Sequence, residues 1–438
     1  MNTEKSTDSV LLQGSGPINP PDPAAVIAAW PAQKPLVALT NGRILDGPRW
    51  TIIASPTKID PINSPDDLDE LLVPGSIAHD SRDSAPPFRN GRILLLSYTL
   101  GKLLEPITTH RISDSAPLGF VLGCPATAAF DHERQIWSGH GPGAAELLDT
   151  IRSTASRENL APDFRLGAIK SELGEQGYRR MVRAALDLIA AGDVYQVNLT
   201  HRLSAEFHGN PRALAAALLD SATPLHGCYA EVPDGESGVR NICSASPELF
   251  LSFDPTTRIV RTSPMKGTRP ISCFAEELRT AEKDRAELNM ITDLMRNDLG
   301  RVCDLGSVRV ERVRTIEAHG RSVWQATSTV SGRLRDRLGI ADLVRAAFPP
   351  GSVTGAPKVR AMQIIDELEP IGRGMYCGAI GWMDDSGAMS LNVAIRTAEI
   401  AGDRISYRTG AGIVADSQPG AEWAETLEKA EVLSRLTS

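Results

Sequence analysis

The stretch GSVTGAPKVRAMQIIDELEP, residues 351–370, passes from a glycine-rich loop into a helical pattern. Pro357 suits the first turn of a helix, where its missing N–H is not needed. The apolar residues that follow lie on one face of such a helix: Met362, Ile365 and Leu368. We therefore predict a helix over residues 357–368.

The glycine-rich half of this stretch is suited to binding an anion. Free N–H groups and the positive end of a helix dipole favour negative charge at a helix N-terminus, and Thr354 and Lys358 would add a hydroxyl and a cation. The spacing to the lysine differs from that of a nucleotide-binding P-loop, and no Ser or Thr follows it. The loop is either an anion site or a plain helix entry, and both interpretations remain open at this point.

Helices and strands are mixed on both sides of this stretch. Helices are predicted for residues 178–191, 276–299 and 421–436, and strands for 194–199, 241–253, 258–262, 379–383, 391–397 and 404–409. Residues 35–137 contain short apolar runs separated by long loops, which also indicate strands. Because no regular βαβ period is present, an α+β fold is predicted in preference to a doubly wound sheet.

Composition excludes several classes of protein. The chain has 438 residues with 46 basic and 54 acidic side chains, for a net charge of -8, so it lacks the basic surplus of a nucleic-acid-binding protein. No apolar run approaches the ~18 residues of a membrane span, and the polar N-terminus does not resemble a signal peptide. Six widely spaced cysteines without a CxxC indicate reduced thiols, and hence a cytoplasmic protein, more readily than a zinc site.

Carboxylates recur on two of the predicted helices. The C-terminal helix carries Glu422, Glu425 and Lys429, with Glu425 and Lys429 four residues apart. The long helix carries Glu287, Asp293 and Asp298, whose oxygens could hold a hard cation such as Mg²⁺. On spacing alone, exposed ion pairs and a solvated helix face explain both sets more simply.

Lys266 has an unusual setting in SPMKGTRP, residues 263–270. Lysine is rare in this chain, and this one stands between Pro264 and Gly267 on a predicted turn after a strand. A lysine held out of solvent can act as an amine nucleophile. Taken by itself, the segment is explained as simply by an exposed turn lysine.

Nine segments in order resemble the chorismate-utilising enzyme family, which includes anthranilate, aminodeoxychorismate, isochorismate and salicylate synthases. They are GDVYQVNL (192–199), SASPELFL (244–251), PMKGTRP (264–270), ELNMITDLMRNDLGRV (287–302), residues 351–370, YCGAIGW (376–382), NVAIRT (392–397), GAGIVADS (410–417) and EWAETLEKA (422–430). The resemblance is strong over residues 164–433 and weaker before them.

The resemblance implies an α+β chorismate-binding fold like that of anthranilate synthase component I, with large antiparallel sheets sandwiched together and helices outside. Residues 1–25 are expected to form a flexible N-terminal arm and residues 26–160 a strand-rich N-terminal region. Residues 161–438 are expected to form the chorismate-binding catalytic region.

The resemblance also implies roles for individual residues. Magnesium would be held by Glu287, Glu425 and, through water, Glu422. The ring carboxylate of chorismate would lie in a pocket formed by Thr354, Gly355, Gly410, Gly412 and Lys429. The enolpyruvyl carboxylate would be held by Tyr376 and Arg396, and Glu248 would be the general acid that protonates the departing ring hydroxyl.

Three positions separate the branches of the family. Water-using members carry a lysine base where this chain has Gln196, and an amide cannot take a proton from water. Lys266 stands where anthranilate synthases have a small residue and aminodeoxychorismate synthases have lysine, whose amine is thought to attack ring C2 before ammonia attacks C4. Gln325 replaces a histidine that is thought to assist pyruvate elimination in anthranilate formation. These positions favour aminodeoxychorismate formation, for p-aminobenzoate and folate synthesis.

Ammonia in this family is normally supplied by a glutaminase subunit. The chain contains no G-x-C-x-G nucleophile segment of such an amidotransferase, so a separate glutaminase partner is expected. Two alternatives remain: an anthranilate synthase component I, for which Lys266 would matter little, or a non-catalytic chorismate-binding subunit.

Overall fold

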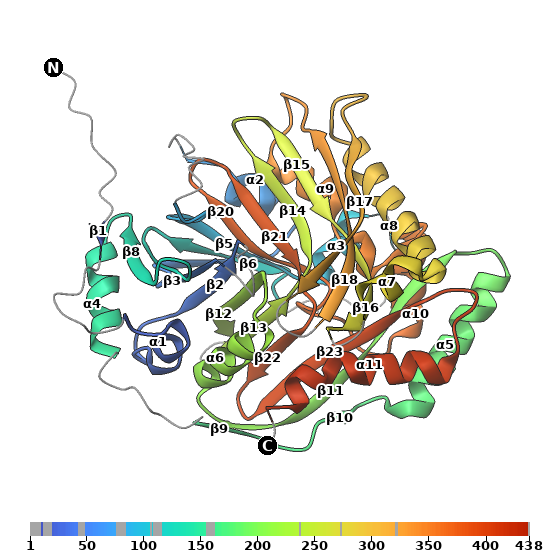
Figure 1. Ribbon diagram of the computed structural model, residues 1–438, viewed down its shortest axis with the longest axis horizontal. Helices are drawn as coiled ribbons and strands as arrows, with labels where there is room; N and C mark the ends of the chain where they lie inside the picture. Colours follow the sequence, from blue (N-terminus) through green and yellow to red (C-terminus); the bar gives the residue numbers. More distant parts are fainter. Residues whose placement is uncertain are drawn as a thin grey trace.

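A computed structural model of the chain describes residues 10–11, 20–42, 49–75, 85–105, 107, 116–154, 163–235, 238–271, 274–319 and 323–436. In these residues, antiparallel strands form two large sheets with helices around them (Figure 1). The predicted α+β class is confirmed. Most of the predicted N-terminal arm, and Cys273, lie outside the described residues.

The first sheet has 13 strands. Its main path runs through β1 (Val10–Leu11), β8 (Ile136–His140), β7 (Thr127–Asp131), β3 (Trp50–Ala54), β2 (Val37–Asn41), β12 (His226–Asp234), β13 (Gly238–Ser246), β22 (Thr397–Ala401), β23 (Arg404–Ile413), β11 (Gln196–Gly209) and β10 (Lys170–Ser171). Two short strands, β9 (Phe164–Leu166) and β19 (Gly355–Ala356), also pair with β11.

The second sheet has ten strands. Its path runs through β16 (Met265–Pro270), β18 (Val323–Arg333), β15 (Ile259–Ser263), β14 (Leu249–Asp254), β21 (Met389–Val393), β20 (Ala379–Asp384), β5 (Gly91–Leu96), β6 (Gly119–Cys124) and β4 (Lys58–Ile62), and β17 (Arg309–His319) pairs with β18. Each sheet takes strands from both the 26–160 and the 161–438 regions, so neither region builds a sheet by itself.

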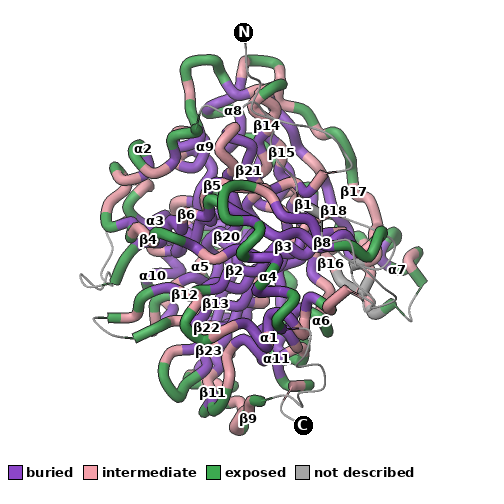
Figure 2. Tube along the Cα trace, turned by 90° about the vertical axis from the view of Figure 1, so that its left-hand side faces the viewer, coloured by how far each residue is buried: buried purple, intermediate pink, exposed green. Residues whose placement is uncertain are grey.

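The two sheets share an apolar core. One buried cluster joins Leu39 and Cys228 of the first sheet to Leu95, Phe120 and Ile380 of the second. Burying such surface stabilises the folded chain by about 25 cal/mol per Å² of apolar area. Figure 2 shows the result: the strands at the centre are buried, and the exposed segments lie mainly in peripheral helices and loops.

Helices cover the outer faces of the sheets. They are α1 (Pro23–Ala29), α2 (Asp67–Leu71), α3 (Tyr98–Leu104), α4 (Ala144–Thr154), α5 (Gly174–Ala190), α6 (Pro211–Ala222), α7 (Ala275–Thr280), α8 (Glu282–Gly300), α9 (Ile340–Ala347), the 3₁₀ turn η2 (Gly351–Val353), α10 (Lys358–Leu368) and α11 (Pro419–Ser434). Among them, α5 and α11 lie against β11 and β23, and α8 lies against β18 (Figure 1). No helix in the described ranges is long and apolar enough to cross a membrane.

Some predicted boundaries are wrong. The single helix predicted over residues 276–299 is two helices, because Ala281 between α7 and α8 has extended backbone angles. The strand predicted over residues 241–253 is likewise two strands, β13 and β14. Lys266 lies within strand β16 and not on a turn, although the positive φ of Gly267 and a register shift interrupt the pairing of β16 with β18 there.

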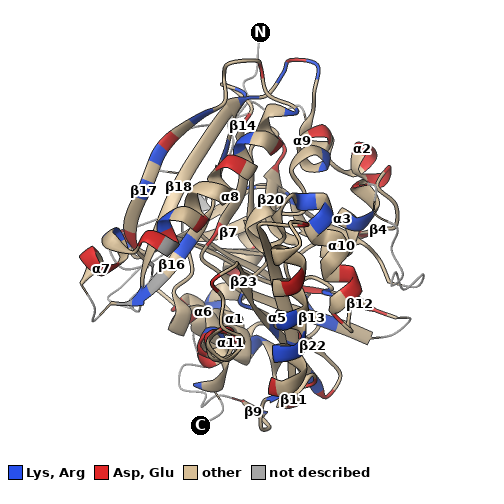
Figure 3. Ribbon diagram, turned by 90° about the vertical axis from the view of Figure 1, so that its right-hand side faces the viewer, with Lys and Arg blue, Asp and Glu red and all other residues tan. Residues whose placement is uncertain are grey.

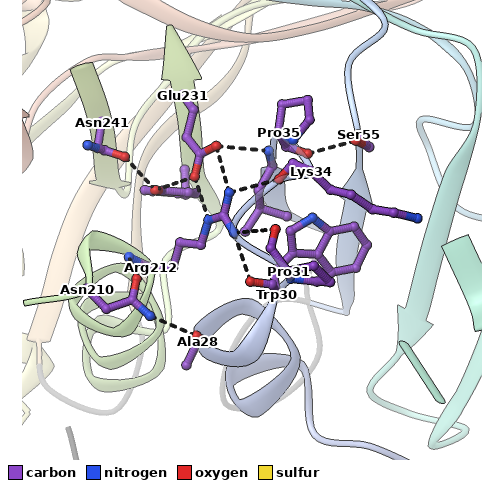
Figure 4. Close-up of polar contacts among 12 residues, drawn as sticks. Ala28, Trp30, Pro31, Lys34, Pro35, Ser55, Asn210, Arg212, Glu231 and Asn241 are labelled. Carbon is purple, nitrogen blue, oxygen red and sulfur yellow. Dashed lines mark hydrogen bonds and ion pairs between the residues drawn. The ribbon is translucent and has the colours of Figure 1, made fainter. Parts of the chain in front are cut away.

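A buried arginine fixes the N-terminal helix to the rest of the fold (Figure 4). The Arg212 guanidinium of α6 binds both carboxylate oxygens of Glu231, at 2.6 and 2.9 Å. Its other donors bind the backbone oxygens of Trp30, Pro31 and Lys34, at 2.8–2.9 Å. A charge removed from water is stable when its donors are filled in this way.

Candidate active site

Strand pairing brings several of the predicted site residues together at one end of β11. Gln196 at the start of β11 is opposite Ala356 of β19, and Val197 is opposite Gly355. On the other edge of β11, Asn198 is opposite Gly412 of β23. Segments far apart in sequence therefore meet at this point.

Lys266 reaches the same point from the second sheet. A Cβ atom placed on Gly412 would lie 2.6 Å from Nε2 of Gln196 and 3.1 Å from Nζ of Lys266. The lysine amine and the glutamine amide therefore lie over the same glycine. Any larger residue at position 412 would displace one of them.

The amide of Gln196 is buried without a protein partner. Its side chain is 0% exposed, and neither Oε1 nor Nε2 has a hydrogen-bond partner among the described residues. A buried unpaired polar group is costly, by about 1–3 kcal/mol. The Gln196 amide thus points inward, at a position where a ligand or water could complete its hydrogen bonds.

Glu248 has the properties of a general acid. It lies between β13 and β14 and is 4% exposed. Burial raises the pKa of Glu248 to about 7, against the opposing charge of nearby Lys266. A carboxyl group with this pKa retains a proton near neutral pH and can donate it.

Arg396 is a cation without a protein counter-ion. Its guanidinium donates no hydrogen bond and forms no ion pair within the described ranges, and burial lowers its pKa, against the opposing influence of Tyr407 and Tyr376. Its backbone has a φ of 51°, and Cys377, next to Tyr376, has a φ of 67°. This left-handed region is uncommon for residues with a side chain, and such backbone strain is often found at functional sites. A half-buried guanidinium without a protein partner is suited to an anionic ligand.

Lys429 lies at the predicted carboxylate pocket. Its Nζ donates a hydrogen bond to the backbone oxygen of Gly410 at 2.9 Å and pairs with Glu425 at 2.7 Å. The structure thus brings Lys429 and Gly410 together. Thr354 is fully buried, but its hydroxyl donates to the backbone oxygens of Pro350 and Gly351 in its own loop.

The three predicted metal ligands come from α8 and α11, whose acidic residues are visible in Figure 3. Glu422 and Glu425 are one turn apart on α11, and both add to the effect of burial in raising the pKa of Tyr178. No group of three His, Cys, Asp or Glu side chains in the described part of the chain is arranged to hold a metal ion. The donors fit Mg²⁺ by chemistry, since this ion uses one or two protein carboxylates and completes its shell with water and substrate oxygens.

Three other charged residues have structural roles, contrary to the roles considered for them. Nζ of Lys358 binds Asp298 at 2.6 Å and the backbone oxygen of Ala347 at 2.8 Å, so neither Lys358 nor Asp298 is available to a ligand. Asp293 is exposed and pairs with Arg296. Lys358 is therefore not available to bind an anion at the glycine-rich loop.

One buried ion pair behind this site was not anticipated from the sequence. Arg373 and Glu369 are both nearly inaccessible to solvent and bind each other at 2.7 and 3.0 Å. In the sequence, Glu369 and Arg373 are four residues apart, just beyond the end of a predicted helix. This spacing usually indicates an ion pair on the protein surface, so it did not predict a buried one.

Comparison with known proteins identifies the family of this chain. The sequence profile of the chorismate binding enzymes matches residues 31–435. Aminodeoxychorismate synthase component 1 of Bacillus subtilis (strain 168) is 35% identical over 373 residues, which cover 80% of this chain and 77% of the relative. Anthranilate synthase component 1 of Streptomyces coelicolor is 41% identical over 381 residues, which cover 80% of this chain and 73% of the relative.

A solved structure gives the same result for the fold. Anthranilate synthase component I from Streptococcus pneumoniae TIGR4 superposes with a TM-score of 0.72 at 30% identity, covering 89% of this chain and 93% of that chain. The chorismate-binding fold predicted from the sequence is thereby confirmed. Sequence profile, relatives and fold agree, and the chain belongs to the family of chorismate binding enzymes.

Proposed function

We propose that the chain is the chorismate-converting component of an aminodeoxychorismate synthase. The observation that carries this proposal is the position of the Lys266 amine beside Gln196 and Gly412, in a site that also holds Glu248. A lysine has no evident use there in anthranilate formation, whereas it can serve as a nucleophile in the substitution of a ring hydroxyl.

The reaction proceeds by two allylic substitutions. The Lys266 amine forms a bond to ring C2, the double bonds shift, and the C4–O bond breaks as Glu248 protonates the oxygen, which leaves as water. Ammonia then forms a bond to C4, the double bonds shift back, and the C2–N bond breaks so that Lys266 leaves as its amine. The ammonium group formed at C4 returns one proton to Glu248. The net change replaces OH by NH₂ at C4, and the enolpyruvyl group is retained.

The surrounding residues support ammonia as the second nucleophile. Gln196 cannot deprotonate water, so hydrolysis to isochorismate lacks a base. On β18, Gln325 is opposite Thr268, next to the position opposite Lys266. Gln325 is not the imidazole that would assist loss of pyruvate, so the enolpyruvyl group stays on the ring.

Chorismate is a dianion, and its two carboxylates need two separate partners. Arg396 and Tyr376 bind the enolpyruvyl carboxylate. Lys429 and the backbone around Gly410 bind the ring carboxylate. Bound Mg²⁺, held by Glu422, Glu425 and Glu287, would supply further positive charge there.

Ammonia comes from a separate glutaminase subunit, and the product enters p-aminobenzoate and folate synthesis in the cytoplasm. The names of the component 1 relatives, which imply a second component, support such a partner.

Product analysis by mass spectrometry tests the proposal. The chain is incubated with chorismate, Mg²⁺ and an ammonium salt at mildly alkaline pH, beside Lys266→Ala and a control, Lys58→Ala. Lys58 is 73% exposed and lies far from the site in sequence and on another strand, β4. We expect a product with NH₂ in place of OH from the wild type and from Lys58→Ala, and none from Lys266→Ala.

Anthranilate synthase is the second candidate, and the 41% identity to the Streptomyces coelicolor enzyme favours it. Formation of anthranilate by both the wild type and Lys266→Ala would establish this activity and refute the lysine mechanism. No product from a wild-type chain that binds chorismate would favour a non-catalytic subunit.

A further inference from the structure

Arg373 connects two separate segments of the site through their backbone oxygens. Its Nη1 donates to the oxygen of Val353 at 2.7 Å, and its Nη2 donates to the oxygen of Asn198 at 2.6 Å. Val353 precedes Thr354 in the glycine-rich loop, and Asn198 is opposite Gly412 in the sheet. One planar guanidinium therefore sets the spacing between the loop and β11.

Glu369 completes this connection. Its carboxylate takes a forked pair of bonds from Arg373 and also accepts the backbone N–H of Thr200 at 2.8 Å. The Arg373 guanidinium in turn lies over the ring of Tyr98, 4.6 Å from its centroid. The pair is thus held in one orientation by partners on every side.

A second arginine extends the connection to β23. Nη2 of Arg408 donates to the backbone oxygens of Ile371 and Gly372, at 3.0 and 2.5 Å, and its Nη1 lies 3.4 Å from the hydroxyl of Thr200. The segment that Arg408 holds leads directly into Tyr376, and Arg408 itself stands two residues before Gly410.

Several points of attachment lie close to proposed substrate-binding residues. Thr354 follows Val353 in the loop, Gly412 is opposite Asn198 in the sheet, and Gly410 lies two residues after Arg408. The network itself is buried: Arg373 is 2% and Glu369 is 4% exposed. Neither side chain is among the proposed substrate contacts. The Arg373–Glu369 pair joins the glycine-rich loop to β11, and Arg408 joins β23 to residues 371–372. The feature that these four segments share is the proposed substrate pocket.

We propose that Arg373 and Glu369 are positioning residues, which set the spacing between the groups that bind the two carboxylates of chorismate. The inference rests on the proposed substrate-binding residues, and it is independent of the nucleophile that follows. Displacing such groups by about 1 Å can lower turnover by about a hundredfold, and it weakens the contacts that bind the two carboxylates.

Arg373→Lys tests this role, with Arg212→Lys as a matched control. Both arginines are buried, form a forked pair with glutamate, and bind backbone oxygens, but Arg212 holds the N-terminal helix (Figure 4). Lysine keeps the charge and loses the planar fork. The dissociation constant for chorismate is measured by calorimetry on each full chain, together with its melting temperature.

We expect both variants to melt at lower temperature, and the dissociation constant for chorismate to rise about tenfold or more in Arg373→Lys only. Equal dissociation constants in the two variants would show that Arg373 serves only the fold and does not position the substrate-binding groups. If Arg373→Lys does not fold, Arg373→Met with Glu369→Gln removes both charges together and decides by the same criterion.

The same measurements separate this inference from the proposed function. A wild-type chain that binds chorismate and yields no aminodeoxychorismate would refute the proposed reaction, and the Arg373 comparison would still be decided by binding. A wild-type chain that fails to bind chorismate would overturn both.

Discussion

Arg212 is buried and Arg396 is half-buried, and the two arginines differ in whether the protein supplies their hydrogen-bond partners. In the N-terminal flank, the Arg212 donors bind a carboxylate and three backbone oxygens (Figure 4). At the candidate site, the Arg396 guanidinium has no hydrogen-bond partner within the described ranges. Gln196 repeats the second pattern, with a buried amide that no described residue completes.

The difference between paired and unpaired polar groups indicates where a ligand could bind. Buried polar groups that serve the fold are paired within the protein, because an unpaired group costs stability. Groups left unpaired at such a cost are suited to a partner that binds later, and one of them, Gln196, lies beside Lys266. Four substitutions test this division, and they are ordered by expected effect.

Arg212→Ala is expected to have the largest effect of the four substitutions, and this effect is on the free energy of unfolding. Removing the cation leaves Glu231, whose side chain is 13% exposed, without its counter-ion, and we expect this to cost about 3 kcal/mol of the free energy of unfolding. Urea denaturation measures this loss. A loss below about 1 kcal/mol, which is the range of an exposed ion pair, would show that the contacts of Arg212 contribute little to stability and would contradict the comparison.

The next largest effect is the pH dependence of stability and activity that Glu248 is expected to cause. Its pKa is raised from 4.5 to about 7, so the folded chain holds a proton that the unfolded chain releases. Folded stability is therefore expected to decline between pH 4.5 and 7, by up to about 3 kcal/mol from this group. Activity that needs the acid form is expected to fall above pH 7.

Glu248→Gln provides the control for that prediction. The amide does not titrate, so this variant should lose the contribution of residue 248 to the slope of stability between pH 4.5 and 7. Identical slopes in the wild type and the variant would show that Glu248 titrates normally.

Arg396→Gln is expected to affect binding and not stability. We expect the affinity for chorismate to fall about a hundredfold, because a charged contact to a carboxylate is lost. The free energy of unfolding should stay constant or rise, since an unpaired cation has been removed. Calorimetry and urea denaturation measure the two quantities, and a loss of stability like that of Arg212→Ala would contradict the comparison.

Gln196→Met has the smallest expected effect on stability. An apolar side chain of similar shape in place of an unpaired amide should leave stability unchanged or raise it by about 1 kcal/mol. Turnover should fall, because the amide beside the lysine amine is lost. A destabilised variant with normal turnover would mean that Gln196 serves the fold alone.

Much of this arrangement could be predicted from the sequence. The beginning of β11, several of the strands that meet there and the segment around Lys266 all have recognisable sequence patterns. The break at Ala281 could not be predicted, since alanine favours helix and only the tertiary structure extends its backbone. The pairing of Lys358 with Asp298 spans 60 residues, which no local spacing reveals.

The central claim is that Lys266 forms a bond to the substrate, and intact-protein mass spectrometry tests it most directly. The chain is mixed with chorismate and Mg²⁺ without ammonia, quenched, and digested to locate any added mass. We predict an adduct equal to chorismate less one water on the peptide that contains Lys266, absent from Lys266→Ala. Turnover of chorismate without any such adduct, or an undiminished rate in Lys266→Ala, would contradict the claim.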